Sequence, residues 1–150
     1  MTREIKLRAW DGKKLCKVLS VKFLAVNGVF AILEGHGRNH TTLKLDNLMQ
    51  STGLKDNTKW EKLTEKEKQD WIKLGETEKT WNGKEIYEGD IVEEKDFGRI
   101  FKIEWDENEA RFELLLEKGL DGYKGQKRHI IDSFKMEIIG NIWEHPELLK

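Results

Sequence analysis

The sequence lacks the cysteine pairs of disulfide-bonded proteins and the long apolar runs of membrane proteins. Cys16 is its single cysteine, so an intramolecular disulfide is excluded. It has one proline, and no apolar run approaches the roughly 18 residues of a transmembrane helix. Residues 1–6 contain three charged side chains and no apolar stretch, so we expect no secretory signal peptide. These absences predict a soluble cytoplasmic protein without disulfides and without a membrane partner.

Net charge is also nearly absent, although charged residues are abundant. Lys and Arg number 27 and Asp and Glu number 28, which gives −1 in a chain that is 37% charged. An average soluble protein is about 25% charged. Six tryptophans and 37% hydrophobic residues are too many for a disordered tail. The 150 residues suffice for one domain with its own core.

Most of the chain has the alternation of half-buried β-strands. Asn27-Gly28 separates two apolar runs and predicts a hairpin, and because both arms are almost wholly apolar we expect both faces to be covered. Residues 43–50 fit a strand or a helical turn equally well. The other expected strands are 3–10, 15–19, 99–105, 111–117, 129–134 and 136–143, and residues 85–93 form a turn that leads into a strand at 91–92. The strands 99–105 and 111–117 suggest a second hairpin, and a short helix starts at Pro146. The pattern predicts a mostly β protein, with a small antiparallel sheet of barrel or sandwich type.

Residues 57–81 do not fit the sheet. Twelve of these 25 residues are charged, and three of the six tryptophans lie here. Thr64 and Glu67 have the spacing of a capping box, and Gly75 is a suitable C-terminal stop. A helix over about 65–74 is therefore predicted, and a second box at Thr58 and Glu61 leaves an earlier start open.

That helix would carry an apolar stripe, formed by Trp60, Leu63, Trp71 and Leu74. Tryptophan is enriched at interface hot spots, so the stripe is a candidate protein-contact surface. The alternative is that it packs the helix onto its own domain. A helix this short needs one partner or the other.

Three stretches of sequence resemble the YopX-like family of phage and prophage proteins. They are residues 5–11, residues 48–56 rejoined at 82–92, and residues 138–149. The resemblance implies one YopX-like domain over 1–150, an SH3-like barrel element, a bacterial host cell and no established activity. It transfers no catalytic residue. The motif residues, which we interpret as structural, are Trp10, Asp11, Gly53, Asp56, Gly83, Tyr87, Gly89, Asp90, Gly140 and Pro146.

The family's Gly-Leu-Lys-Asp and Asn-Gly-Lys-Glu motifs are usually nearly adjacent, whereas residues 57–81 separate them here. We therefore interpret this segment as a helical insertion. Long insertions in a surface turn cost little closure entropy.

Glu85, Glu88 and Asp90 form an acidic group that could bind a divalent cation or act as an acid–base pair. The favoured interpretation is a turn, in which Gly89 takes a positive φ and Asp90 accepts backbone amides. A metal site would need more oxygen ligands.

His36 and His40 are spaced like half of a zinc site, but Cys16 is the only thiol. We interpret residues 35–40 as a solvated loop and Cys16 as a small buried hydrophobic residue. No metal, cofactor or nucleophile is therefore assigned.

A weak basic bias marks the N-terminal third. Residues 1–50 hold nine basic and four acidic groups, whereas 51–100 and 101–150 each sum to −3. The candidate nucleic-acid contacts are Lys13, Lys14, Lys17, Lys22, Lys124, Lys127 and Arg128. A pI near 6.5 argues against such a role, because nucleic-acid binders are usually basic.

The sequence thus favours a non-enzymatic phage or prophage accessory protein that acts through protein contacts or self-association. The alternative is a nucleic-acid-binding β-barrel that uses the basic N-terminal half. A hydrolase or metal-dependent enzyme with a carboxylate site is the third and least supported hypothesis.

Overall fold

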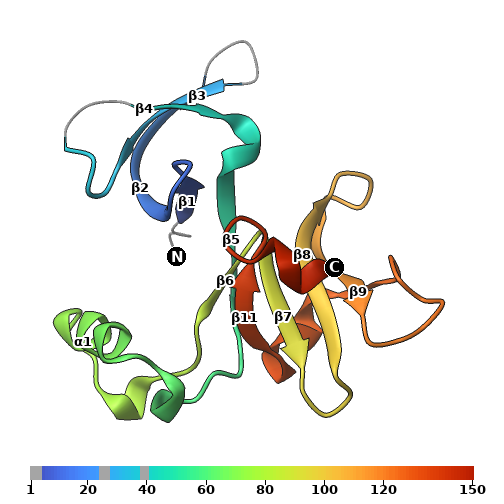
Figure 1. Ribbon diagram of the computed structural model, residues 1–150. Coiled ribbons are helices and arrows are strands. Elements are labelled where there is room, and N and C mark those ends of the chain that lie inside the picture. The colour runs from blue at the N-terminus through green and yellow to red at the C-terminus, as the bar shows by residue number, and fades with distance from the viewer. Residues whose placement is uncertain (1–4, 24–27, 38–40) are drawn as a thin grey trace. The chain divides into compact units, whose positions relative to one another are not determined.

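A computed structural model describes residues 5–23, 28–37 and 41–150 of the chain (Figure 1). This part of the chain is mostly β, as predicted, with eleven strands in two antiparallel sheets and a single α-helix. The strands are β1 Leu7–Trp10, β2 Leu15–Phe23, β3 Gly28–Leu33, β4 Thr41–Lys44, β5 Leu48–Lys55, β6 Glu85–Tyr87, β7 Asp90–Glu94, β8 Arg99–Asp106, β9 Arg111–Lys118, β10 Lys127–His129 and β11 Glu137–Asn141. The helix is α1 Glu65–Lys73, and short 3-10 helices are η1 Leu45–Asn47, η2 Trp60–Lys62, η3 Glu78–Thr80, η4 Ile130–Lys135 and η5 Pro146–Leu149.

The chain divides into two compact units, Met1–Ser51 and Thr52–Lys150, and β5 runs from the first into the second. The single YopX-like domain over 1–150 stays a prediction.

The first unit contains the strand order β4-β3-β2-β1-β5. The predicted hairpin is confirmed, since β2 pairs antiparallel with β3, while its Asn27 turn lies outside the described residues. The strand expected over 15–19 continues into the first arm of the hairpin, because β2 is one strand over Leu15–Phe23 with an irregularity between Val18 and Ser20. A β-bulge of this kind lets a strand continue while it bends.

A buried cluster covers one face of this sheet, made by Ala9, Cys16, Val29, Ala31, Leu33 and Leu43. The expectation that both faces of the hairpin are covered is wrong. Phe30 is 37% exposed, and Lys22, which lies opposite it on β2, is exposed as well. Apolar residues in consecutive positions thus do not prove that a strand is buried on both faces.

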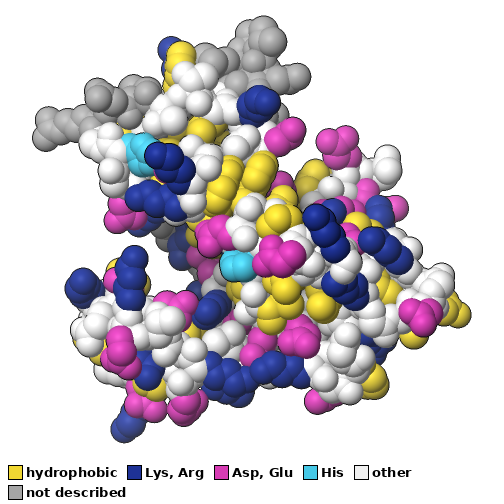
Figure 2. Space-filling model, viewed as in Figure 1, with side chains coloured by type: hydrophobic (Ala, Val, Ile, Leu, Met, Phe, Trp, Pro, Cys, Tyr) yellow, Lys and Arg dark blue, Asp and Glu magenta, His cyan; other side chains and the backbone are white. Residues whose placement is uncertain are grey.

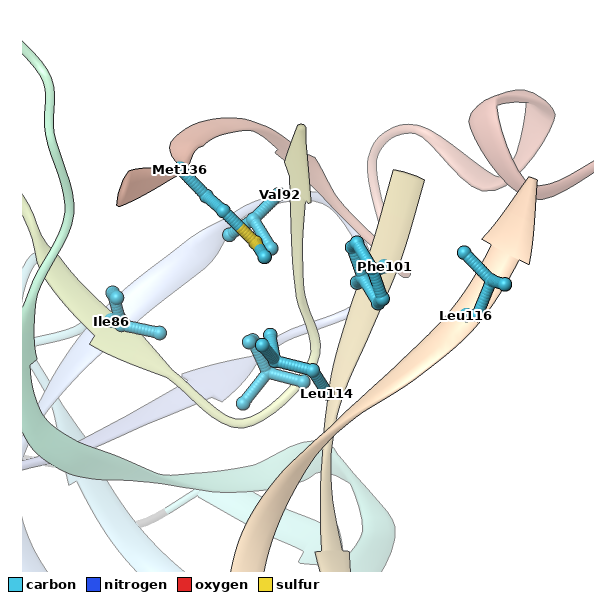
Figure 3. Close-up of a cluster of buried hydrophobic side chains, with 7 residues drawn as sticks. Ile86, Val92, Phe101, Leu114, Leu116 and Met136 are labelled. Carbon is cyan, nitrogen blue, oxygen red and sulfur yellow. The ribbon is translucent and has the colours of Figure 1, made fainter. Parts of the chain in front are cut away.

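The second unit contains the strand order β10-β9-β8-β7-β11. The predicted second hairpin is β8 with β9, in which Ile103 faces Leu114 across the ladder. Its buried cluster is shown in Figure 3, where Ile86, Val92, Leu114 and Met136 converge beside Phe101 and Leu116. The SH3-like barrel stays a prediction.

Residues 129–134 and 43–50 differ from a simple strand. The strand expected over 129–134 is wrong, because β10 ends at His129 and η4 follows. The His129 ring accepts the amide of Ile131, which diverts the backbone from the ladder. The ambiguous residues 43–50 contain the end of β4, the turn η1 and the start of β5.

The predicted helix is confirmed as α1, which ends within one residue of the prediction (Figure 1). That residues 57–81 are an insertion stays a prediction. The Thr64 hydroxyl accepts the Glu67 amide, and the Glu67 carboxylate accepts the Thr64 amide. Gly75 ends the helix with a φ of +84°. The earlier start does not occur, because Thr58 bonds to Asp56 and residues 60–62 form a separate 3-10 turn.

Candidate functional site

The first unit presents a basic sheet face opposite its buried cluster. Strands β1 to β4 contain four basic residues and neither Asp nor Glu. Lys22 lies opposite Phe30, and Phe30 lies opposite Thr42 on the next strand. We define the basic face as Arg8, Lys17, Lys22, Phe30, Thr42 and Lys44. An exposed aromatic ring among cations is the combination that binds single-stranded nucleic acid.

Charge is divided between the two units. The first 51 residues hold nine basic and four acidic groups, a net charge of +5, which leaves −6 for residues 52–150. Figure 2 shows acidic and basic side chains interspersed over the second unit on the side that faces the viewer. The near-zero total therefore hides a basic unit and an acidic one.

The predicted C-terminal basic run is already neutralised by acids of the second unit. Lys124 pairs with Glu117, and the Lys127 ammonium donates to Asp106. Arg128 pairs with both Glu94 and Asp132. Lys127 holds the pKa of Asp106 down at about 2, with help from the backbone amides of residues 108 and 109. These cations are poor candidates for phosphate contacts because they already bond to carboxylates.

A second feature of the first unit brings together Asp11, Cys16 and His36. The His36 Nε2 atom lies 2.8 Å from Asp11 Oδ2 and 3.7 Å from Cys16 Sγ. Cys16 Sγ lies 3.5 Å from the same Asp11 oxygen. Asp11 follows β1, Cys16 lies in β2, and His36 follows β3. The pairing of these three strands therefore brings the three side chains together.

The electrostatics of this cluster are set by its hydrogen bonds. The Lys14 amide, which donates to Asp11 Oδ1 at 2.8 Å, is the main cause that lowers the pKa of Asp11 well below its usual range. The Lys13 amide and His36 act in the same direction. Burial raises the pKa of the Cys16 thiol, and the Asp11 carboxylate raises it further. In the absence of a bound cation, Cys16 is therefore a protonated thiol.

The cluster changes the interpretation of His36. The sequence predicts a solvated loop over 35–40, yet His36 is half-buried and contacts Asp11 and Cys16. His40 lies outside the described residues. Cys16 is buried, as expected, but it is not only a hydrophobic filler. The spacing of 5 and 20 residues forms no motif, because only the pairing of β1, β2 and β3 joins these positions.

The motif residues of the second unit act in backbone turns. Asp56 Oδ1 accepts the amides of Thr58 and Lys84, and Oδ2 accepts the Thr58 hydroxyl and the Ile138 amide. A Cβ atom on Gly83 would lie 2.1 Å from the Asp56 carbonyl oxygen. These contacts join residues 56, 58, 84 and 138 within this unit, and the structural role of the motif residues stays a prediction.

The Glu88-Gly89-Asp90 segment forms the expected turn. Gly89 has a φ of +85°, and Asp90 Oδ2 accepts the Tyr87 amide at 2.8 Å. The Tyr87 hydroxyl donates to Glu85. Glu85 and Asp90 are thus committed to local hydrogen bonds.

The remaining motif positions also lie in turns or strand ends. The Trp10 carbonyl accepts the Asn47 side chain, and Gly53 takes a positive φ within β5. Gly140 packs against His145, and Pro146 begins η5.

The family comparison fits the placement of these motifs. Residues 78–150 match the model of the YopX protein family. The match contains the motifs at 82–92 and 138–149 and all of β6 to β11, and it confirms the resemblance there. The stretches at 5–11 and 48–56 lie outside it, so their resemblance stays a prediction. No curated protein matches the chain.

Residues 78–150, which match the family model, contain an open pocket of about 310 Å³. Glu88, Lys102, Glu104 and Glu107 contribute its charged lining. Among the described residues that line it, neither Glu85, nor Asp90, nor a histidine is present. The pocket therefore does not bring Glu85 and Asp90 together with Glu88.

The inserted segment that leads into the YopX match packs its tryptophans on one another. Trp81 lies 6.1 Å from Trp60 and 5.2 Å from Trp71 between ring centroids, both edge-to-face. The Trp71 indole donates to the Thr77 carbonyl. Of the predicted stripe, Leu63 is buried and Trp60 and Trp71 are half-buried, while Leu74 is exposed. Much of the stripe is therefore used inside the second unit.

Among the described residues, no helix is long and apolar enough to cross a lipid bilayer.

Proposed function

We propose that this protein is a non-catalytic phage or prophage accessory protein that binds single-stranded nucleic acid through the basic face of its first unit. The observation that carries the proposal is the separation of charge, +5 in residues 1–51 against −6 in the rest. A near-neutral pI argues against nucleic-acid binding only when the charge is evenly spread, and here it is not.

The chemistry of the basic face fits a phosphate backbone with stacked bases. Lys17, Lys22 and Lys44 are exposed and point away from the buried cluster. Each phosphate that they neutralise releases a counterion, which drives binding. The ring of Phe30, 37% exposed beside Lys22, offers a surface on which a base can stack.

Fluorescence anisotropy with labelled single-stranded DNA and RNA tests the proposal. Three backbone contacts, made by Lys17, Lys22 and Lys44, predict that log K falls with log salt with a slope of roughly −2. Lys17→Glu with Lys22→Glu should abolish binding at moderate salt. Phe30→Ala should weaken binding by about 1–3 kcal/mol, the usual value of one stacked base.

A matched charge reversal provides the control. Lys66→Glu with Lys79→Glu changes the net charge equally but lies on exposed positions of the insertion. It should bind nearly as well as the wild type. If both double variants lose the same affinity for nucleic acid, the loss follows from the net charge of the protein and the basic face is not the binding site. If the wild type does not bind at low salt, the proposal is wrong.

Protein contact through the insertion is the second candidate. No residue of α1, which is described throughout, is buried, and Ile72 is 48% exposed and Leu74, which follows it, 74% exposed. Light scattering coupled to size exclusion tests self-association. A dimer that becomes a monomer in Ile72→Ser with Leu74→Ser supports it, and a wild-type monomer at high concentration argues against it.

A further inference from the structure

We propose that Asp11, Cys16 and His36 form a binding site for a divalent transition-metal ion of the zinc type. The site is separate from the basic face and does not depend on nucleic-acid binding. One ligand atom of each side chain lies within 4.8 Å of the other two. Outside this trio, the described residues contain no comparable group of three such donors.

The donor set selects the class of ion. A thiolate, an imidazole nitrogen and a carboxylate oxygen are the three donor types that zinc uses in proteins. Calcium and magnesium require mainly oxygen ligands, and a single carboxylate cannot supply them. Binding would release the Cys16 proton, so that a thiolate and a carboxylate balance the two charges of the ion.

The distances fit a tetrahedral ion after a small adjustment. Metal–sulfur and metal–nitrogen bonds of about 2.3 and 2.0–2.1 Å place neighbouring ligands roughly 3.3–3.6 Å apart. The two distances to Cys16 Sγ, 3.5 and 3.7 Å, are close to this range. The His36–Asp11 distance is 2.8 Å because it is a hydrogen bond, and it must lengthen by about 0.5 Å.

The elements around the site permit that adjustment. His36 is on a turn after β3, and its side chain is 30% exposed, whereas that of Asp11 is 6% exposed. The Asp11 carboxylate is held by the Lys13 and Lys14 amides through Oδ1, which leaves Oδ2 directed at the cluster. The carboxylate, the buried thiol and the partly exposed imidazole would supply three ligands, and water would be the fourth.

A nucleophilic Cys–His–Asp triad explains the geometry less well. In such a triad the two ring nitrogens divide the work, one to the nucleophile and the other to the carboxylate. Here the same atom, His36 Nε2, approaches both Cys16 and Asp11. Three donors that converge on one point are the arrangement of ligands around an ion.

Titration of the untagged full-length protein with Zn²⁺ and Co²⁺ tests the site. We expect one equivalent of Zn²⁺ by calorimetry and a rise in melting temperature. Co²⁺ should give tetrahedral ligand-field bands together with a thiolate-to-cobalt charge-transfer band, which requires Cys16. Cys16→Ser should abolish that band, and His36→Gln should weaken binding by more than about 100-fold, the upper cost of losing an outer-shell partner.

Asp11→Asn separates ligation from a structural role. The amide oxygen can still accept the Lys13 and Lys14 amides, so the turn is kept while the carboxylate ligand is lost. The variant should fold and bind Zn²⁺ weakly, while His129→Gln, which alters an exposed histidine, should bind normally. Undiminished Zn²⁺ binding in Cys16→Ser with His36→Gln, or no binding by the folded wild type, would overturn the proposal and leave a hydrogen-bonded turn.

Discussion

Asp56 joins three separate parts of the second unit through its two carboxylate oxygens. It is 4% exposed and accepts from residues 58, 84 and 138. Buried carboxylates are tolerated when backbone amides satisfy them, and amide bonds to a charged acceptor are among the stronger hydrogen bonds. The close approach of Gly83 belongs to the same arrangement.

Gly83→Ala should therefore destabilise the protein strongly. Gly83 has a φ of +106°, and the new Cβ would lie 2.1 Å from the Asp56 carbonyl oxygen. Backbone strain alone costs about 1–3 kcal/mol, and the clash adds to it, so we expect a loss above about 2 kcal/mol. Urea denaturation followed by tryptophan fluorescence measures the change.

Gly122→Ala is the matched control for that substitution. Gly122 also has a positive φ, +80°, but no atom lies within 4 Å of the position that its new Cβ would take. It should lose only about 1 kcal/mol, the cost of a left-handed conformation. Equal losses in the two variants would show that the Asp56 contact is unimportant.

The pair Asp106–Lys127 should make stability depend on acid. The pKa of Asp106 falls from 3.8 to about 2, chiefly because the Lys127 ammonium donates to it. A lowered carboxyl pKa stabilises the fold above the unfolded value, and this contribution is lost as the pH falls from about 4 towards 2. Asp106→Asn should flatten the pH profile of the denaturation midpoint in this range.

Lys127→Gln tests the cause of that acid dependence. It leaves the backbone amides of residues 108 and 109 on Asp106, so it should remove part of the slope but not all of it. A wild-type profile in Asp106→Asn would contradict the prediction.

For single residues, the sequence predicts turns better than contacts between side chains that are far apart in the chain. Glu88-Gly89-Asp90 is a turn because its residues bond to neighbours, and local chemistry is visible in sequence. Asp11 and His36 are 25 positions apart, and their contact depends on the pairing of β1 with β2 and of β2 with β3. The same limit explains why the predicted stripe of Trp60 and Trp71 omits Trp81.

No residue of α1 is fully buried, so the helix depends strongly on its own capping residues. Thr64→Ala should destabilise the helix by about 1 kcal/mol, the usual value of an N-cap. Hydrogen exchange of the α1 amides should rise accordingly. Thr64→Ser keeps the hydroxyl and should exchange like the wild type, and equal protection in all three proteins would show that packing holds the helix.

The elements that the sequence predicts correctly begin or end at residues whose local hydrogen bonding is recognisable in the sequence. The capping box and Gly75 bound α1, and Asp106 with the residues after it closes the β8–β9 hairpin. The elements that are predicted wrongly have no such residues at their ends. The bulge between Val18 and Ser20 joins two expected strands, and the 3-10 turn after His129 replaces another, because sheet pairing and side-chain capping decide both.

Across the whole molecule, the two units have unequal cores. The first is built largely of small side chains, including Ala9, Cys16 and Ala31, whereas the second buries Phe101, Ile103, Leu114 and Met136. Buried apolar area sets local stability, at about 25 cal/mol per Å². The first unit should be the less stable one.

Native-state hydrogen exchange of the full chain measures this difference. Amides of β2 and β3 should exchange more than about tenfold faster than those of β8 and β9, through openings smaller than global unfolding. If zinc binds the Asp11 cluster, its addition should slow exchange in β2 and β3 selectively. Identical protection in both sets of strands would show one cooperative structure and would support the single-domain prediction.

The hydrogen bonds at the base of the insertion have a consequence for engineering. The Asp56 amide donates to the Lys84 carbonyl, and the Lys84 amide donates back to the Asp56 side chain. These two bonds lie outside α1, and each doubling of an intervening loop costs only about 0.6 kcal/mol. A reporter peptide or an affinity tag inserted at an exposed position of α1, away from Thr58 and Leu63, should therefore leave the register of β5 and β6 undisturbed.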